Sequence, residues 1–350
     1  MSMRYGVKHF VRNIPRCYVS VRTLHYKSSA SLRQPFNYVA QSRQDYRSTQ
    51  RTLKSSDQAS CDSRKDEQSS QREPYMNRTA NNPFKAFDLT DGVYIVTGGA
   101  GGIGLAMSES LAEAGGEVYC FDRNEFPSEE FHMAKVHLHS QYGAGSLHYQ
   151  RVDITDTEGL EATVENIASK KERLDGLIAA AAVIQVTAAM NYDMEDAKKL
   201  MDVNLIGALA TANACAKQMF KYKSRGSMCL IASMSGLIAN KGLLSPVYNA
   251  SKAAVIQLAR NLSMEWSKVR VDGTGGLRVN ALSPGHVVTP MVRQTFKDAP
   301  GVQEIWEAEN HMGRLGDPSE FKGAALFLLS NASSYMTGNN LVIDGGHTAW

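Results

Sequence analysis

Short apolar runs alternate with stretches of helical periodicity from about residue 84 to residue 350. The run at 93–96 has the length of a strand buried on both faces, and further strands are expected at 117–121, 147–152, 176–182, 227–232, 278–283 and 340–344. Apolar residues recur at helical spacing between them, most clearly at 102–115, 158–170, 194–220, 247–268 and 319–330. Strands and helices that alternate in this way build a parallel sheet with helices on both faces. The pattern predicts a single α/β domain, doubly wound, with about seven parallel strands.

A glycine-rich turn follows the first apolar run. The run ends at Thr97-Gly98-x-x-x-Gly102-Ile103-Gly104, and helical spacing starts at Leu105. A turn from a buried strand into a helix exposes unpaired backbone N–H groups at the positive end of the helix dipole. This arrangement suits a pyrophosphate, which side chains in place of the glycines would hold away. A turn that serves only tight packing is the alternative, and the strand–turn–helix context favours a dinucleotide site.

Asp122 ends the second predicted strand, 20 residues beyond Gly102. This is the spacing expected of the carboxylate that binds the adenosine ribose. A carboxylate accepts hydrogen bonds from both ribose hydroxyls and repels a 2′-phosphate, so we expect NAD rather than NADP. Arg123 beside it weakens that exclusion. An ordinary surface carboxylate at a strand end is the alternative, and the spacing argues against it.

Two further polar motifs lie at the ends of later predicted elements. Ser233 and Ser235 come just past the strand at 227–232, and Tyr248-x-x-x-Lys252 opens the helix at 247–268. Residues four apart share one helix face, so the phenol and the ammonium can point into the same cleft. A cation about 4 Å from a phenolate stabilises it by roughly 4 kcal/mol at an effective dielectric constant of about 20. We therefore predict a lowered Tyr248 pKa and a proton-transfer role.

With these motifs the chain resembles the short-chain dehydrogenase/reductase family over about residues 88–350. The resemblance implies an α/β Rossmann fold and an NAD(P)-dependent alcohol dehydrogenase or reductase. Its motifs are Thr97-Gly98-x-x-x-Gly102-x-Gly104, Asp153 in Val-Asp-Ile, Val203-Asn204-Leu205, Ser233, Tyr248-x-x-x-Lys252, Pro284-Gly285-x-x-x-Thr289 and Asp344-Gly345-Gly346.

The resemblance also implies roles for individual residues. Tyr248 would be the general acid/base, and Ser233 would hydrogen-bond the substrate oxygen, with Ser235 as the second choice. Lys252 would bind the nicotinamide ribose, and Asn204 would hold a water in a proton relay. The residues expected to bind the cofactor are Thr97, Gly98, Gly102, Ile103, Gly104, Asp122, Asp153, Ile154, Tyr248, Lys252, Pro284, Gly285, Val287 and Thr289.

The chain departs from the family pattern at two places. Four alanines, Ala179 to Ala182, replace the usual Asn-Asn-Ala-Gly, so small size is kept but an amide is lost. His311 replaces a frequent proline, so the predicted substrate lid near residues 290–316 can differ from its relatives.

Within the family, residues 233–240 and the final Gly-Gly-His-Thr-Ala-Trp resemble fungal polyol dehydrogenases. These include NAD-dependent D-arabinitol 2-dehydrogenases, mannitol dehydrogenases and sorbose reductases, so a polyol/ketose pair is the expected substrate. A mitochondrial 3-oxoacyl-carrier-protein reductase is the alternative enzyme, and a non-catalytic dinucleotide-binding protein is the alternative of another class. Residues expected to line the substrate pocket are Val183, Gln185, Leu243, His286, Met291 and Trp306.

The N-terminal part of the chain differs in composition. Residues 1–44 hold eight Lys or Arg and no Asp or Glu. This composition predicts a mitochondrial transit peptide over residues 1–45, and hence the matrix, or the cytoplasm if the leader is not functional. A basic tail that binds anionic surfaces is the alternative. Residues 46–83 are polar with few large apolar side chains, which predicts a disordered linker before the domain at 84–350.

The remaining composition limits the partners. Residues 1–50 hold nine of the chain's 38 basic and one of its 35 acidic residues, so the rest is net acidic at −5 and gives no support for nucleic-acid binding. We expect no membrane span, and no metal site at His132, His137 and His139. The predicted helices at 194–220 and 247–268 resemble those of family tetramer interfaces, so a homo-oligomer, dimer or tetramer, is expected.

Overall fold

The computed structural model describes residues 83–141, 145–241, 243–298 and 301–350. These residues belong to one compact unit, Pro74–Trp350. The predicted transit peptide and all but the last residue of the predicted linker lie outside the described residues, so both stay predictions.

Seven strands form one parallel sheet in the order β3-β2-β1-β4-β5-β6-β7. All residues of β1, β4 and β5 are buried, which is why they appear as unbroken apolar runs in the sequence. The predicted α/β class and the parallel sheet are confirmed. The strands are β1 (Val93–Thr97), β2 (Glu117–Asp122), β3 (Ser146–Arg151), β4 (Gly176–Ala179), β5 (Ser227–Ile231), β6 (Arg278–Pro284) and β7 (Asn340–Ile343).

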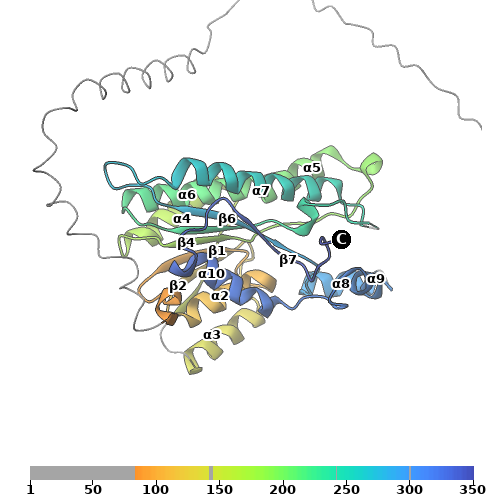
Figure 1. The fold of residues 1–350 in the computed structure, drawn as a ribbon, viewed down its shortest axis with the longest axis horizontal. Coiled ribbons are helices and arrows are strands. Elements are labelled where there is room, and N and C mark those ends of the chain that lie inside the picture. Colours follow the sequence, from red (N-terminus) through yellow and green to blue (C-terminus); the bar gives the residue numbers. More distant parts are fainter. Residues whose placement is uncertain (1–82, 142–144, 242, 299–300) are drawn as a thin grey trace, which may run out of the picture. The chain divides into compact units, whose positions relative to one another are not determined.

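Helices cover both faces of the sheet and bury one hydrophobic core on each (Figure 1). One face carries α4 (Thr157–Ser169), α6 (Ala208–Lys221) and α7 (Pro246–Trp266). The other face carries α2 (Gly102–Glu113), α3 (Glu129–Gln141) and α10 (Lys322–Leu329). The two helix layers confirm the doubly wound arrangement.

Three predicted elements have different limits in the structure. The predicted strand 176–182 ends at Ala179, because the chain turns there toward the Thr97 side chain, which accepts a hydrogen bond from the Ala181 N–H. The predicted helix 194–220 is divided into α5 (Met194–Met201), a π-helical segment η4 (Asp202–Gly207) and α6. The predicted helix 319–330 begins as the 3₁₀-helix η6 (Pro318–Phe321) and continues as α10.

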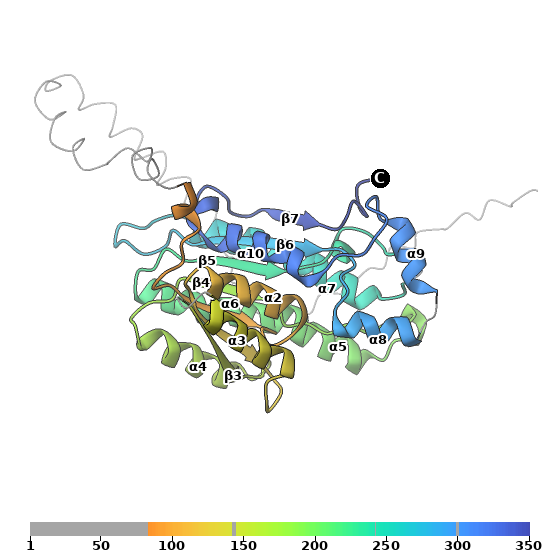
Figure 2. The same ribbon diagram turned by 90° about the horizontal axis from the view of Figure 1, so that it is seen from below.

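Several short helices were not singled out by the periodicity. Near the predicted lid lie α8 (Pro290–Asp298) and α9 (Val302–Glu309), at the end of the domain toward which the strands point (Figure 2). Helix α3 buries Phe131, Ala134 and Leu138, but three histidines interrupt its apolar pattern. The remaining 3₁₀-helices are η2 (Pro83–Phe87), η3 (Ala189–Asn191), η5 (Met234–Gly236) and η7 (Asn331–Ser333).

Candidate active site

A cavity of about 880 Å³ lies at the carboxyl ends of the central strands. Strand β1 pairs with β2 on one side and with β4 on the other, so the order of the strands reverses at this point. Ligands of open parallel sheets bind at such a reversal. The predicted site residues that line this cavity are Gly98, Gly102, Ile103, Gly104, Asp122, Asp153, Ile154, Ser233, Tyr248, Lys252, Pro284, Gly285, Val287 and Thr289.

The glycine-rich turn between β1 and α2 fits a pyrophosphate. Helix α2 begins after Gly101 without a side-chain cap, so its first N–H groups are left for a ligand. A Cβ at Gly101 would meet no protein atom within 4 Å, which leaves open space in the cavity wall. A Cβ at Gly104 would lie 2.1 Å from the Gly98 carbonyl oxygen, so only glycine permits this close turn. These features give a dinucleotide phosphate group room and donors.

The end of the cavity beside β2 and β3 carries two carboxylates and one guanidinium. Asp122 and Asp153 both line it, with Arg123 between β2 and α3. Hydrogen bonds from the Thr155 N–H and hydroxyl to Asp153 Oδ1, at 2.9 and 2.7 Å, lower the pKa of that carboxyl, and the charge of Arg123 adds to this effect. Asp122 Oδ1 accepts from the Asn124 N–H at 3.3 Å. Asp122, the carboxylate expected at the ribose, therefore lies in the cavity. Arg123, which weakens the expected preference for NAD over NADP, lies there as well.

The opposite end brings together the predicted catalytic side chains. Ser233 hydrogen-bonds the Tyr248 hydroxyl, which makes it the better choice over Ser235. Lys252 lies one helical turn after Tyr248, with its Nζ 5.8 Å from the centre of the tyrosine ring. The same Nζ donates a hydrogen bond to the Ile231 carbonyl oxygen at 2.8 Å. A serine, a phenol and an ammonium thus meet at one wall of the cavity.

Two effects of the protein itself act on the pKa of Tyr248. Burial raises it, and the hydrogen bond with Ser233 opposes that rise. Burial also lowers the pKa of Lys252 to about 8. The ammonium is hydrogen-bonded to a backbone carbonyl and lies beside the ring, so in this arrangement desolvation outweighs its attraction for the phenolate. The phenol is consequently a proton donor as it stands.

Among the predicted catalytic and cofactor-binding residues, Asn204 and Thr97 do not line the cavity. Asn204 lies in η4, where its Oδ1 accepts from the Val183 N–H at 2.8 Å and its Nδ2 donates to the Val183 carbonyl at 2.9 Å and to Ser251 Oγ at 3.1 Å. Thr97 Oγ1 accepts from the Ala181 N–H at 3.2 Å. Both side chains fix the alanine-rich segment after β4 against the cavity. The proton-relay role of Asn204 stays a prediction.

The lid side of the cavity is aromatic. The imidazole of His286 stacks on Trp306 with ring centres 4.1 Å apart, and His347 meets it edge-on at 5.2 Å. Burial lowers the pKa of His286 to about 4, so this ring is neutral near pH 7. Leu243 and Val183 also line the cavity, whereas Gln185 does not. The side chain of Met291 lies outside the described residues.

The described residues hold neither a candidate metal cluster nor a candidate membrane-spanning helix. No group of three or more His, Cys, Asp or Glu side chains among them is placed to hold a metal ion. Within the same residues, none of the helices has both the length and the apolar character that crossing a bilayer requires.

Comparison with known proteins gives the family. A family model described as enoyl-(acyl carrier protein) reductase matches residues 98–348. The D-arabinitol 2-dehydrogenase [ribulose-forming] of Scheffersomyces stipitis is 34% identical over 284 residues, which is 79% of this chain and 100% of that protein. A probable NADP-dependent mannitol dehydrogenase of Yarrowia lipolytica is 36% identical over 273 residues, 77% of this chain and 92% of that protein.

A solved structure leads to the same family. The short-chain type dehydrogenase/reductase from Mycobacterium marinum superposes with a TM-score of 0.69 at 30% identity, covering 76% of this chain and 99% of that one. The predicted resemblance is therefore confirmed, including its likeness to polyol dehydrogenases. The chain belongs to the short-chain dehydrogenase/reductase family and is an NAD(P)-dependent alcohol dehydrogenase/reductase.

Proposed function

We propose that the protein interconverts a polyol and its ketose with NAD(H), in the manner of a D-arabinitol dehydrogenase. The observation that carries the proposal is the hydrogen-bonded Ser233–Tyr248 pair beside Lys252 at one end of the cavity, with the phosphate-binding turn at the other. The names of the curated relatives favour a polyol over other secondary alcohols.

The side chains at the wall suggest how the proton moves. Ser233 and Tyr248 hold the oxygen of the reacting carbon between their hydroxyls. In ketone reduction the neutral Tyr248 donates its hydroxyl proton to that oxygen, and in alcohol oxidation the tyrosine oxygen takes the proton back. Lys252 stabilises the phenolate formed in between. A bound nicotinamide dinucleotide supplies or accepts the hydride.

Activity assays test this proposal. The purified protein is assayed with NAD and NADP against D-arabinitol and mannitol, and with NADH and NADPH against a 3-oxoacyl thioester. Oxidation of a polyol at a higher kcat/KM than reduction of the thioester is the expected result. The reverse preference would support a 3-oxoacyl-carrier-protein reductase. Dinucleotide binding without any turnover would support a non-catalytic binding protein.

Asp122→Ala is expected to relax the cofactor preference toward NADP. The carboxylate repels a 2′-phosphate, and its removal leaves Arg123 in the same part of the cavity as an attractive charge. We expect the kcat/KM ratio of NAD to NADP to fall by about tenfold or more, which corresponds to roughly 1.4 kcal/mol of discrimination. The measurement is kcat/KM with each cofactor before and after the substitution.

Asp156→Ala is the matched control for Asp122. Asp156 caps helix α4 by accepting from the Gly159 N–H at 3.1 Å, and it does not line the cavity. This variant should lose some stability and keep the cofactor ratio. An unmutated protein that already prefers NADP would overturn the proposed role of Asp122.

We also propose that residues 1–45 direct the protein to the mitochondrial matrix. Eight basic residues without an acid favour import across a membrane with a negative interior. A fluorescent fusion of the full chain should then be mitochondrial, and deletion of residues 1–80 should return it to the cytosol. The deletion changes both the charge and the length of the chain. The control therefore replaces Arg4, Arg12, Arg16 and Arg22 with Gln in the full chain, which removes charge at constant length. A diffuse full-length fusion would defeat the targeting proposal.

We expect a homo-oligomer, a dimer or a tetramer, as the resemblance implies. Helices α6 and α7 cover the same face of the sheet (Figure 1). On α7, Met264 is 75% exposed, so this layer offers an apolar side chain to a second copy.

A further inference from the structure

The C-terminal turn after β7, residues 344–348, is closed by its own hydrogen bonds. Asp344 Oδ1 accepts from the Gly346 N–H at 2.9 Å, and its Oδ2 accepts from the Thr348 N–H at 2.9 Å and from the Thr348 hydroxyl at 2.6 Å. Gly346 has a φ of 87°, a left-handed conformation that favours glycine. The turn is therefore held in one shape, and it carries His347, which is 7% exposed.

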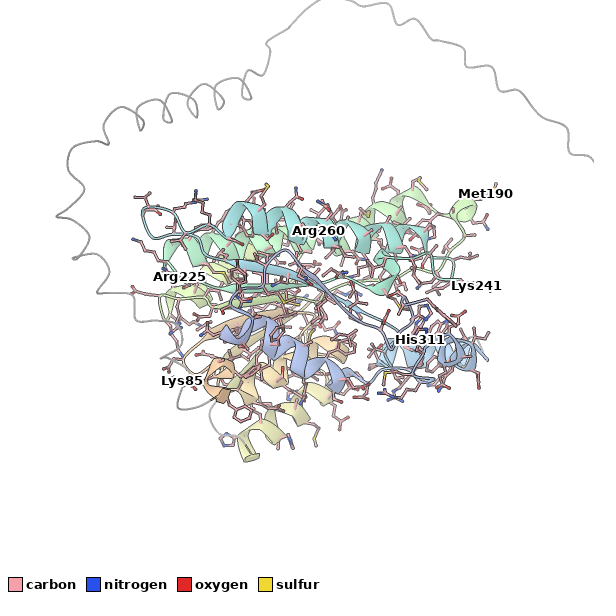
Figure 3. All side chains as sticks on the ribbon, viewed as in Figure 1. Lys85, Met190, Arg225, Lys241, Arg260 and His311 are labelled. Atoms are coloured by element: carbon pink, nitrogen blue, oxygen red, sulfur yellow. The ribbon has the colours of Figure 1, made fainter. Side chains whose placement is uncertain are left out.

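The turn packs against the segment that follows α9. The Gly345 carbonyl accepts from the Met312 N–H at 3.1 Å, and a Cβ at Gly346 would lie 2.7 Å from the Cβ of His311. Figure 3 shows His311 at the end of the domain where α8 and α9 lie. The ring of His311 also meets that of Trp350 edge-on, with ring centres 5.1 Å apart. The end of the chain is therefore joined to the predicted lid.

His347 adds a hydrogen bond to this junction. Its Nδ1 lies 3.1 Å from the Oδ1 of Asn310, which follows directly on α9 and is 6% exposed. The Nδ2 of Asn310 donates to the Arg314 carbonyl at 2.8 Å. In this orientation of the amide, Oδ1 is the acceptor, so Nδ1 of His347 carries the proton. The bond holds the end of α9 against the C-terminal turn.

The ring of His347 also touches a ring that lines the cavity. It meets the imidazole of His286 edge-on, with ring centres 5.2 Å apart. His286 in turn stacks on Trp306 of α9 at 4.1 Å, with 4° between the ring planes. Within the described part of the chain, the ring nitrogens of His286 have no hydrogen-bond partner. The orientation of this imidazole therefore depends on its two aromatic contacts.

His347 can affect a substrate only through the side chains that it holds. His286 and Trp306 line the same cavity as Ser233 and Tyr248, whereas His347 does not line it. Side chains that bind a ligand must be held within about 0.5 Å of the productive position by their own packing and hydrogen bonds. A loosened His286 ring and a shifted α9 would therefore weaken substrate binding without touching the groups that transfer the proton.

We propose that His347 is a positioning residue, which fixes the imidazole of His286 and helix α9 at the lid side of the cavity. The C-terminal turn thereby sets how tightly the enzyme binds its alcohol or ketone. This inference goes beyond the proposed function, because it holds for whichever alcohol or ketone the cavity takes.

Kinetics of His347→Ala in the full chain test the inference. The variant is assayed with D-arabinitol and NAD, with D-ribulose and NADH, and with a 3-oxoacyl thioester and both reduced cofactors. We expect KM for the turned-over substrate to rise by about fivefold or more. We expect kcat and the affinity for NADH to change by less than about threefold, because only binding at the lid side is lost.

Two conservative variants separate the two contacts of His347. His347→Asn places an amide N–H close to the position of the imidazole Nδ1–H, so it keeps a donor for Asn310 and loses the ring. His347→Phe keeps a ring edge for His286 and loses the donor. Each variant should raise KM by less than His347→Ala does. If the alanine variant does not fold, as its melting temperature shows, these two variants replace it.

His148→Ala is the matched control. His148 also has one ring contact and one hydrogen bond, since it stacks on Tyr119 at 4.8 Å and its Nε2 lies 2.9 Å from Ser146 Oγ. It lies on β3 and does not line the cavity. Its replacement should lower the melting temperature and leave KM unchanged.

Fluorescence of Trp306 tests the positioning without any substrate. The chain has three tryptophans, so Trp306 is the only one left after Trp266→Phe and Trp350→Phe. Trp306 is 6% exposed and stacked on His286, so acrylamide should quench it poorly. Adding His347→Ala to this background should increase the quenching constant by about twofold or more, and adding His148→Ala should not.

The outcomes separate the inference from the proposed function. A folded His347→Ala protein with unchanged KM, or with unchanged quenching of Trp306, would overturn the inference. An equal KM increase in His148→Ala would show a general loss of stability and would overturn it as well. Turnover of the thioester but not of D-arabinitol would defeat the proposed function alone, and KM for the thioester then tests His347. In a protein inactive with every substrate, the quenching of Trp306 decides.

Discussion

Tyr248→Phe is expected to lower kcat by about three orders of magnitude or more, because it removes the hydroxyl that we propose to transfer the substrate proton. The substitution keeps the half-buried ring and deletes the oxygen that Ser233 contacts. Lys252 keeps its hydrogen bond to the Ile231 carbonyl and its place beside the ring. We therefore expect the affinity for NADH to stay within about threefold, a difference below 1 kcal/mol.

Steady-state turnover and a fluorescence titration with NADH measure the two quantities. Tyr192→Phe is the control, since Tyr192 is a buried tyrosine, its hydroxyl has no partner among the described residues, and it does not line the cavity. That variant should keep its kcat. A Tyr248→Phe protein that retains most of its activity would show that another group donates the proton.

Strands β1, β4 and β5 were predictable because burial on both faces leaves an apolar run that is visible in the sequence. The interruption of the predicted helix 194–220 was not predictable from periodicity. Asn204 lies in η4, and its side chain forms hydrogen bonds with the backbone of Val183, which lies 21 residues earlier in the chain. Such long-range contacts override the local preference for an α-helix. Single π-helical turns within α-helices occur frequently at functional sites.

The site was predictable where spacing along one element fixes geometry. Tyr248 and Lys252 share a helix face, and the glycine turn follows directly from its strand. The Tyr248 pKa also depends on burial, which raises it and which the spacing of two residues does not reveal.

Gly104→Ala is expected to have the other large effect, on dinucleotide binding. The new Cβ would lie 2.1 Å from the Gly98 carbonyl oxygen, and a backbone atom cannot rotate away. The turn must open, and overpacking of this kind costs about 1–3 kcal/mol. Because the turn carries the N–H groups at the start of α2, we expect NADH affinity to fall by about tenfold or more, together with a lower melting temperature.

Alanine variants at two other glycines distinguish strain in the turn from loss of space for the cofactor. Gly101→Ala places a Cβ in the open cavity with no protein atom within 4 Å, so it should weaken NADH binding and leave the melting temperature unchanged. Gly323→Ala, on the exposed side of α10, also meets no atom within 4 Å, and it should stabilise the helix by up to about 1 kcal/mol without any effect on binding. Calorimetry and NADH fluorescence on the three variants measure both effects. Unchanged NADH affinity in Gly104→Ala and Gly101→Ala would mean that this turn does not contact the cofactor, because one substitution strains the turn and the other fills the space that the pyrophosphate needs.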